Sequence, residues 1–239
     1  MTAPVQTQWI TVPTAAGAMP AYLALPPGGS GPGLLLLQEI FGVNSHIRAV
    51  AEQYALAGFV VLAPDVFWRQ APRVDLGYDG ADRERGMQLA GALQPAEVAA
   101  DLQRAVAALR ARPEVAQGAA AAKVGTIGYC LGGRLAYSAA ALTDVDAAVA
   151  FYGGGIASQL ALASQVRCPM LFHFAGSDAH IPPEAVQAVR QAFIGKPAEV
   201  LEYPGATHGF NCWQRASYHA PSAALALGRS LTFLAQHLF

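Results

Sequence analysis

The chain has 239 residues, of which 54% are hydrophobic and 13% are charged, and its formal net charge is -1. A chain this apolar can bury enough surface to offset the entropy of ordering it, which excludes intrinsic disorder. Since it has no basic excess and no run of about 18 apolar residues, nucleic acid and membrane partners are not expected. We expect a single domain over residues 1–239, because α/β domains of about 200–250 residues are common.

The N-terminal sequence and the cysteine content favour a reducing compartment. Polar residues at positions 6–8 interrupt the segment in which a secretory signal would need an unbroken apolar stretch. Cys130, Cys168 and Cys212 are odd in number, too few for a disulfide framework, and not closely spaced as zinc ligands often are. We therefore expect a cytoplasmic protein without a metal site.

Apolar runs of strand length alternate with segments of helical period along most of the chain. The runs are continuous, which is typical of parallel strands buried on both faces. Residues 8–12 and 21–25 are expected to form an antiparallel hairpin at the sheet edge. The expected buried strands cover residues 34–38, 59–63, 124–129, 147–152, 170–175 and 200–203. The expected helices cover residues 45–57, 95–112, 131–142, 182–193 and 221–238.

This order predicts an α/β fold with a mostly parallel, doubly wound sheet flanked by helices. In the first helix, Ser45 is the expected N-cap and Gly58 the expected stop. One segment, residues 67–93, departs from the alternation as a long polar insertion with four arginines. Long insertions after a strand end often form lids or binding loops.

The segment Gly128-Tyr129-Cys130-Leu131-Gly132 joins an expected strand directly to an expected helix. This is the nucleophile-elbow pattern G-x-S-x-G with cysteine in place of serine. Its glycines are needed because side chains at those positions would collide with the neighbouring strand and helix. The pattern predicts a nucleophilic Cys130 at a helix N-terminus, where the helix dipole favours a thiolate.

Two later segments complete a possible catalytic set. Asp178 follows the strand expected at 170–175, and His208 lies in a glycine-flanked loop after the strand expected at 200–203. The chain order of nucleophile, acid and histidine is that of the α/β-hydrolases. Separately, Asp178 could instead cap the helix that begins near Pro182, and His208 could be an ordinary loop histidine.

The three groups predict acyl transfer through a thioester. His208, oriented by Asp178, would take the thiol proton, and Cys130 would attack a carbonyl carbon before water releases the acid. The oxyanion needs two donors, which we expect to be the backbone N–H of Leu131 and one N–H from the loop at residues 39–42. One such donor lowers the barrier by roughly 2.7–4 kcal/mol.

Seven short segments together resemble the dienelactone hydrolases, or carboxymethylenebutenolidases, of the α/β-hydrolase fold. They occur in order over nearly the whole chain. They are QEIFGVN at 38–44, APD at 63–65, RQAP at 69–72, GYCLGG at 128–133, FYG at 151–153, GSD at 176–178 and THGF at 207–210.

The resemblance implies a triad of Cys130, Asp178 and His208 with oxyanion donors at Ile40 and Leu131. It further implies that Glu39 lies beside the resting thiol and takes part in its activation when substrate arrives. A solvent-exposed strand-end glutamate is the alternative. The substrate pocket would be lined by residues that include Tyr152, Phe41 and Trp213.

The family binds the carboxylate of its substrate with two arginines, as planar bidentate recognition favours. The first matches Arg83 by spacing, with Arg85 as a rival. The second should lie four residues after the histidine, but Cys212 occupies that position. Either Arg215 reaches the pocket instead, or the anion anchor is weaker and the rim near Trp213 is apolar.

We therefore expect a cofactor-free, cysteine-dependent carboxylic ester hydrolase of the dienelactone hydrolase type, which acts as a monomer on a small-molecule ester or lactone. A general carboxylesterase or thioesterase is the nearest alternative. A non-catalytic ligand-binding protein and a thiol redox sensor are alternatives of other classes. The other histidines are interpreted as structural or surface residues, because they have no mutual ligand spacing: His46, His173, His180, His219 and His237.

Overall fold

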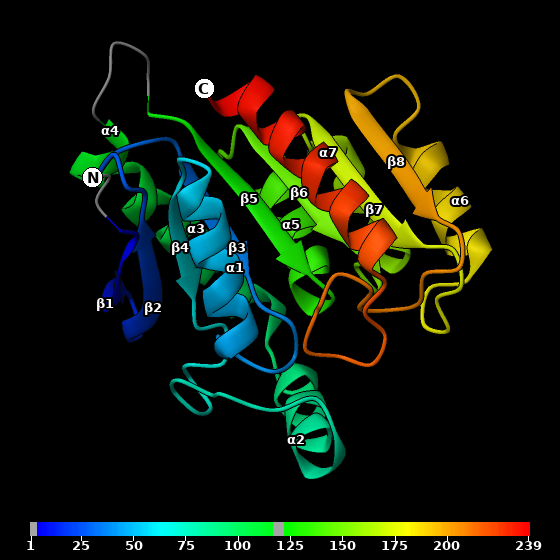
Figure 1. Cartoon of the computed structure of the whole chain (residues 1–239), viewed down its shortest axis with the longest axis horizontal. Coiled ribbons are helices and arrows are strands. Elements are labelled where there is room, and N and C mark those ends of the chain that lie inside the picture. Colours follow the sequence, from blue (N-terminus) through cyan, green and yellow to red (C-terminus); the bar gives the residue numbers. More distant parts are fainter. Residues whose placement is uncertain (1–3, 117–121) are drawn as a thin grey trace.

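One eight-stranded sheet organises the protein, whose computed structural model describes residues 4–116 and 122–239. The strand order is β1-β2-β4-β3-β5-β6-β7-β8 (Figure 1). Strands β3 to β8 run parallel, and β1 and β2 add an antiparallel hairpin at one edge. The strands are β1 Gln6–Thr14, β2 Gly17–Leu25, β3 Gly33–Leu37, β4 Val60–Pro64, β5 Val124–Tyr129, β6 Ala147–Phe151, β7 Met170–Ala175 and β8 Ala198–Tyr203.

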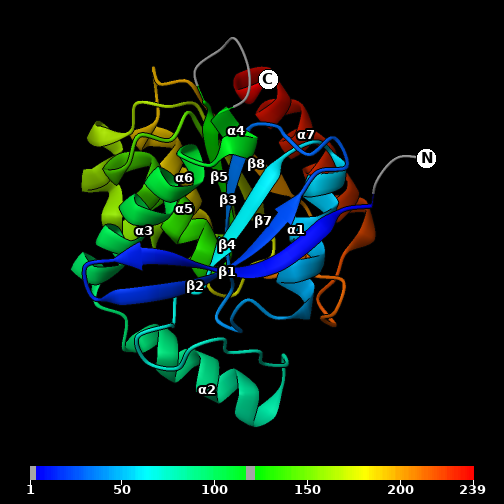
Figure 2. The ribbon, with the colours of Figure 1, turned by 90° about the vertical axis from the view of Figure 1, so that its left-hand side faces the viewer.

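Helices cover both faces of the sheet. Helices α1 and α7 lie on one face, and α3, α5 and α6 lie on the other (Figures 1 and 2). Helix α2 stands apart from both layers, beyond one end of the strands (Figure 1). The helices are α1 Ser45–Leu56, α2 Gly80–Gly91, α3 Pro95–Arg110, α4 Pro113–Ala116, α5 Leu131–Leu142, the 3-10 segment η1 Ile156–Gln165, α6 Pro183–Ala192 and α7 Ala220–Leu238.

The central strands are buried along their whole length, as their unbroken apolar sequences predict. Every residue of β3, β4, β5, β6 and β7 is buried. The one histidine among them, His173, hydrogen-bonds Tyr203 Oη at 2.8 Å and Ser230 Oγ at 3.0 Å, and burial lowers its pKa to about 3. Its interpretation as a structural residue therefore agrees with its surroundings.

The expected doubly wound sheet with an edge hairpin is confirmed, and the predicted strands and helices start and end within a few residues of the observed ones. The N-cap assignment was wrong. Asn44, not Ser45, has the extended backbone of a cap and accepts a hydrogen bond from the Ile47 N–H at 3.2 Å. Ser45 is already helical, and a cap must precede the first helical residue.

Three helical segments were not predicted. The polar insertion contains α2, while α4 and η1 are short segments with little periodicity to reveal them. In the parts of the chain that the structure describes, no helix is both long and apolar enough to cross a bilayer.

Candidate active site

Cys130 lies in a strained turn between β5 and α5. Its backbone has φ 55° and ψ -113°, a conformation that costs a non-glycine residue about 1–3 kcal/mol. Two glycines make the turn possible, because a Cβ on Gly128 would overlap the carbonyl of Gly132, and a Cβ on Gly132 would overlap that of Leu37. The turn therefore holds the sulfur at the N-terminus of α5.

Loops at the ends of two neighbouring strands bring a histidine and an acid to this sulfur. His208 Nε2 lies 3.1 Å from Cys130 Sγ, and its Nδ1 lies 2.8 Å from Asp178 Oδ2. The other oxygen of Asp178 accepts a hydrogen bond from the backbone N–H of His180 at 2.8 Å. Asp178 does not cap the following helix, whose N-cap is Pro182.

The electrostatics of this group favour a charged histidine. Burial alone would lower the pKa of His208, but the hydrogen bonds with Asp178 and Cys130 raise it to about 10. Burial alone would raise the pKa of Asp178, yet the hydrogen bond from His208 holds it below its ordinary value. An imidazolium between a carboxylate and a sulfur is thus the favoured state at neutral pH.

Glu39 is buried and paired with an arginine. Arg215 Nη1 donates to Glu39 Oε1 at 3.0 Å, and the carboxylate is only 1% exposed. Burial raises the pKa of Glu39, an effect that Arg215 partly offsets. The alternative interpretation of Glu39, as an exposed strand-end residue, was wrong, because its side chain is buried and paired with Arg215. Its described partner is Arg215, while the sulfur of Cys130 contacts His208.

Ile40 and Leu131, the two expected oxyanion donors, both line the pocket that contains Cys130. Leu131 is the first residue of α5, so its N–H has no acceptor within the helix. Helix α2 packs against the loop of Ile40, since a Cβ on Gly86 would overlap the Ile40 carbonyl. The glycine thus lets α2 approach this loop closely.

The pocket above Cys130 has a volume of about 250 Å³. Hollows of about 410 and 660 Å³ lie elsewhere on the molecule, and neither is lined by Cys130 or His208. The chemistry therefore locates the site better than size does. The pocket is lined by Ile40, Phe41, Arg83, Met87, Ala90, Cys130, Leu131, Arg134, Gly154, His180, His208 and Arg215.

Three arginines line this pocket, and they come from different parts of the chain. Arg83 projects from α2 and Arg134 from α5, while Arg215 lies in the loop that follows His208. Arg85 and Cys212 are not in the lining, whereas Arg215 is. Among the described residues, Arg83 and Arg134 form no ion pair with an acid.

Of the aromatic residues expected in the pocket, only Phe41 lies in its wall. Tyr152 is fully buried and packs its ring 5.2 Å from the His208 ring, so it supports the histidine from behind. Trp213 is 41% exposed and packs on His46 instead. Neither residue is part of the pocket lining.

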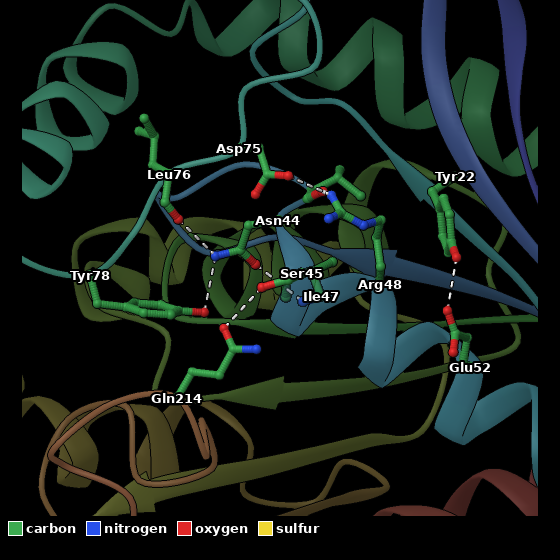
Figure 3. A network of polar contacts seen from close by, with 11 residues as sticks. Tyr22, Asn44, Ser45, Ile47, Arg48, Glu52, Asp75, Leu76, Tyr78 and Gln214 are labelled. Carbon is green, nitrogen blue, oxygen red and sulfur yellow. Dashed lines mark hydrogen bonds and ion pairs between the residues drawn. The ribbon is translucent and has the colours of Figure 1, made fainter.

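The insertion is attached to the loop that follows β3. Asn44 Nδ2 donates to the Leu76 carbonyl at 3.1 Å and to Tyr78 Oη at 3.0 Å, as Figure 3 shows. Arg48 Nη1 bonds Asp75 Oδ2 at 2.9 Å in the same network (Figure 3). The start of α1 therefore holds the segment that leads into α2 and Arg83.

Among the ionisable residues of the pocket, sequence reasoning missed Arg134 and His180. His180 was interpreted as structural or surface and is indeed exposed, but it also lines the pocket, and its ring lies 5.1 Å from that of His208. Arg134 lies four residues after the nucleophile, one helical turn into α5, and this spacing places both on the same face of the helix. That spacing was the available signal.

A mostly parallel sheet with an elbow after β5, an acid after β7 and a histidine after β8 is the arrangement of an α/β-hydrolase. Residues 19–238 match the dienelactone hydrolase family. The chain belongs to this family and is a hydrolase, as the sequence predicted.

Relatives and solved structures agree with this membership. The chain is 36% identical over 217 residues to a carboxymethylenebutenolidase of Pseudomonas putida, with 90% of each chain covered. It is 34% identical to the carboxymethylenebutenolidase of Pseudomonas sp. strain P51, covering 91% of this chain and 90% of the other. A Klebsiella pneumoniae crystal structure described as a dienelactone hydrolase superposes with a TM-score of 0.84 at 31% identity, covering 98% of this chain and 99% of that one.

Proposed function

We propose that the protein opens lactones or activated esters through a thioester on Cys130. The observation that carries the proposal is the continuous chain from Asp178 through His208 to the sulfur, with distances of 2.8 and 3.1 Å, at the floor of the pocket. A nucleophile and a base within hydrogen-bond reach, with the base oriented by a third group, are what covalent catalysis requires.

The first half of the reaction forms the acyl-enzyme. Cys130 Sγ attacks the carbonyl carbon, and the oxyanion is stabilised by the N–H groups of Ile40 and Leu131. The ester C–O bond then breaks, and the leaving oxygen takes the proton from His208 Nε2. In a lactone the leaving oxygen stays attached to the acyl chain.

The second half releases the acid. Water gives a proton to His208 Nε2 and attacks the thioester carbonyl, and the C–S bond breaks to restore the imidazolium and the thiolate. Asp178 keeps the ring oriented and stabilises its charge in both halves. Glu39 is proposed as an assisting carboxyl, which takes part through its contact with Arg215.

The pocket favours an anionic acyl group. Arg83, Arg134 and Arg215 all line a small pocket that also has apolar walls, and guanidinium groups bind carboxylates in a planar, bidentate manner. The curated relatives above are carboxymethylenebutenolidases, which fits a lactone that carries a carboxylate. The apolar wall at Phe41 and Met87 also suits neutral esters, which makes a general carboxylesterase the second candidate.

A panel of matched lactones and esters, with and without a carboxylate, tests both candidates by kcat/KM. The first is supported by a preference for carboxylated substrates of at least about tenfold. Equal or better turnover of neutral esters supports the second.

The nucleophile is tested separately. Cys130→Ala and His208→Ala should abolish turnover, while Cys168→Ala, at a buried thiol away from the pocket, should not alter it. Rapid quenching of the wild-type protein should reveal acyl adducts on Cys130 by mass spectrometry. Turnover at the wild-type rate in Cys130→Ala would overturn the proposal.

A further inference from the structure

Three side chains of metal-binding type meet in the interior beside the active site. Glu39 follows β3, His46 lies in the first turn of α1, and Cys212 lies in the loop after His208. One ligand atom from each lies within 4.8 Å of those of the other two. All three are at most 1% exposed.

Most polar atoms of this cluster have no partner. Neither ring nitrogen of His46 has a hydrogen-bond partner among the described residues, and neither does Glu39 Oε2. Each orphaned group costs about 1–3 kcal/mol when buried. The packing leaves an imidazole and a carboxylate oxygen aimed at the same space, with a sulfur beside them.

The surroundings of the cluster restrict what could occupy that space. Arg215 already pairs with the other oxygen of Glu39, and the rings of Trp213 and His46 form a T-shaped contact at a centroid distance of 4.3 Å. A carboxylate oxygen, an imidazole nitrogen and a thiolate are all electron-pair donors. Such a set suits a borderline-soft cation, because sulfur and nitrogen ligands select zinc over magnesium or calcium.

We propose that Glu39 Oε2, a ring nitrogen of His46 and Cys212 Sγ bind one Zn²⁺. Ligand atoms around tetrahedral zinc are roughly 3.3–3.8 Å apart, so ligand atoms that now lie within 4.8 Å of one another must approach by about 1.5 Å at most. On binding, the Cys212 thiol gives its proton to solvent, and a sulfur–zinc bond forms without any redox change. The fourth position is left for water.

The site shares Glu39 with the hydrolytic machinery, and this gives zinc an effect on turnover. A metal on Oε2 competes for the carboxylate that holds Arg215, and it stiffens the loop of Ile40 next to Glu39. Zinc should therefore lower kcat. The predicted decrease in kcat rests on the proposed function, whereas zinc binding itself does not.

The test of binding uses Zn²⁺ alone with the Cys130→Ala protein, in which the catalytic thiol cannot compete for metal. We expect one tightly bound zinc per chain and a change in the fluorescence of Trp213, which is absent in a Trp213→Phe control. Cys212→Ser and His46→Gln, each on the same background, should weaken binding by at least about 100-fold.

A second measurement does not depend on changing the proposed ligands. Cys130→Ala combined with Cys168→Ala leaves Cys212 as the one thiol of the chain. Co²⁺ should give this protein a thiolate-to-cobalt charge-transfer band. Absence of both the band and stoichiometric zinc would overturn the proposal and leave an ordered water as the occupant, and binding that survives Cys212→Ser would do the same.

The effect on turnover is measured as the ratio of kcat with and without zinc, for the wild type and for His46→Gln. Loss of the zinc effect in His46→Gln supports the shared role of Glu39, and an equal effect in both refutes it. If the wild type turns over no ester, the proposed function fails while the binding test still stands.

Discussion

Replacing Arg215 by methionine should expose the cost of a buried carboxylate. Methionine keeps much of the volume of the arginine stem but removes the guanidinium that donates to Glu39 Oε1 at 3.0 Å. Glu39, which is 1% exposed, would then lie in the interior without its cationic partner. The carboxylate must either stay charged without a partner or take up a proton.

The expected loss of unfolding free energy differs between the two partners of this ion pair. Breaking a buried ion pair by removing one partner costs about 3–5 kcal/mol, and we expect about 3 kcal/mol for Arg215→Met. Glu39→Gln should cost only about 1 kcal/mol, because the side chain of Arg215 is 19% exposed and still reaches water. The double variant should lose about 2 kcal/mol, less than the sum, which gives a coupling of about 2 kcal/mol.

The direction in which stability changes with pH gives an independent test of the charge on Glu39. Burial already raises the pKa of Glu39 above its ordinary value, and loss of Arg215 raises it further. A folded-state pKa above the unfolded value of 4.5 means that stability is present below that pH and lost as pH rises through the folded pKa. Arg215→Met should thus lose more stability than the wild type above pH 4.5.

Urea denaturation of the four proteins, followed by circular dichroism between pH 4.5 and 8, measures both effects. Additive free energies, together with a pH profile for Arg215→Met that parallels the wild type, would refute the reasoning. That result would mean that Glu39 is neutral or solvated in the native protein.

Three further changes test other contacts. Asp178→Asn should lower kcat by about 10³–10⁴-fold. Its stability deficit relative to the wild type, measured in urea, should narrow as pH rises from 6.5 through about 10, because wild-type His208 loses its proton over this range. A deficit that stays constant with pH would contradict this. Gly86→Ala should lower kcat about tenfold or more, because the new Cβ displaces the Ile40 carbonyl; unchanged kinetics would exclude the contact. Arg83→Ala should lower kcat/KM about 10–100-fold for carboxylated lactones only.

The sequence was sufficient for the sheet because burial on both faces leaves a strong local signal. Strands such as residues 124–129 and 170–175 are mostly apolar runs without a polar–apolar alternation, and they were predicted to the residue. The elbow was equally visible, since its glycines and the strand and helix around them are adjacent in the chain. Helical segments without a regular apolar period, such as α4 and η1, were not predicted.

The side-chain partners could not be predicted in the same way. The pairing of Glu39 with Arg215 joins residues 176 positions apart, and the proximity of His46 to Cys212 depends on how α1 packs against the loop after His208. The spacing of residues along the chain does not indicate such long-range contacts. For the same reason, the direction of Trp213 away from the pocket follows only from its packing on His46.

The contact between Gly86 and the Ile40 carbonyl links two tasks in one place. Helix α2, which carries the proposed carboxylate anchor Arg83, contacts the loop whose N–H is proposed to stabilise the oxyanion. Substitutions in α2 are therefore constrained at Gly86, because a bulkier residue there would lower the reaction rate while it changed the substrate preference. Changes in substrate preference should therefore arise first at the solvent-facing residues of α2, because substitutions there leave the loop of Ile40 in place.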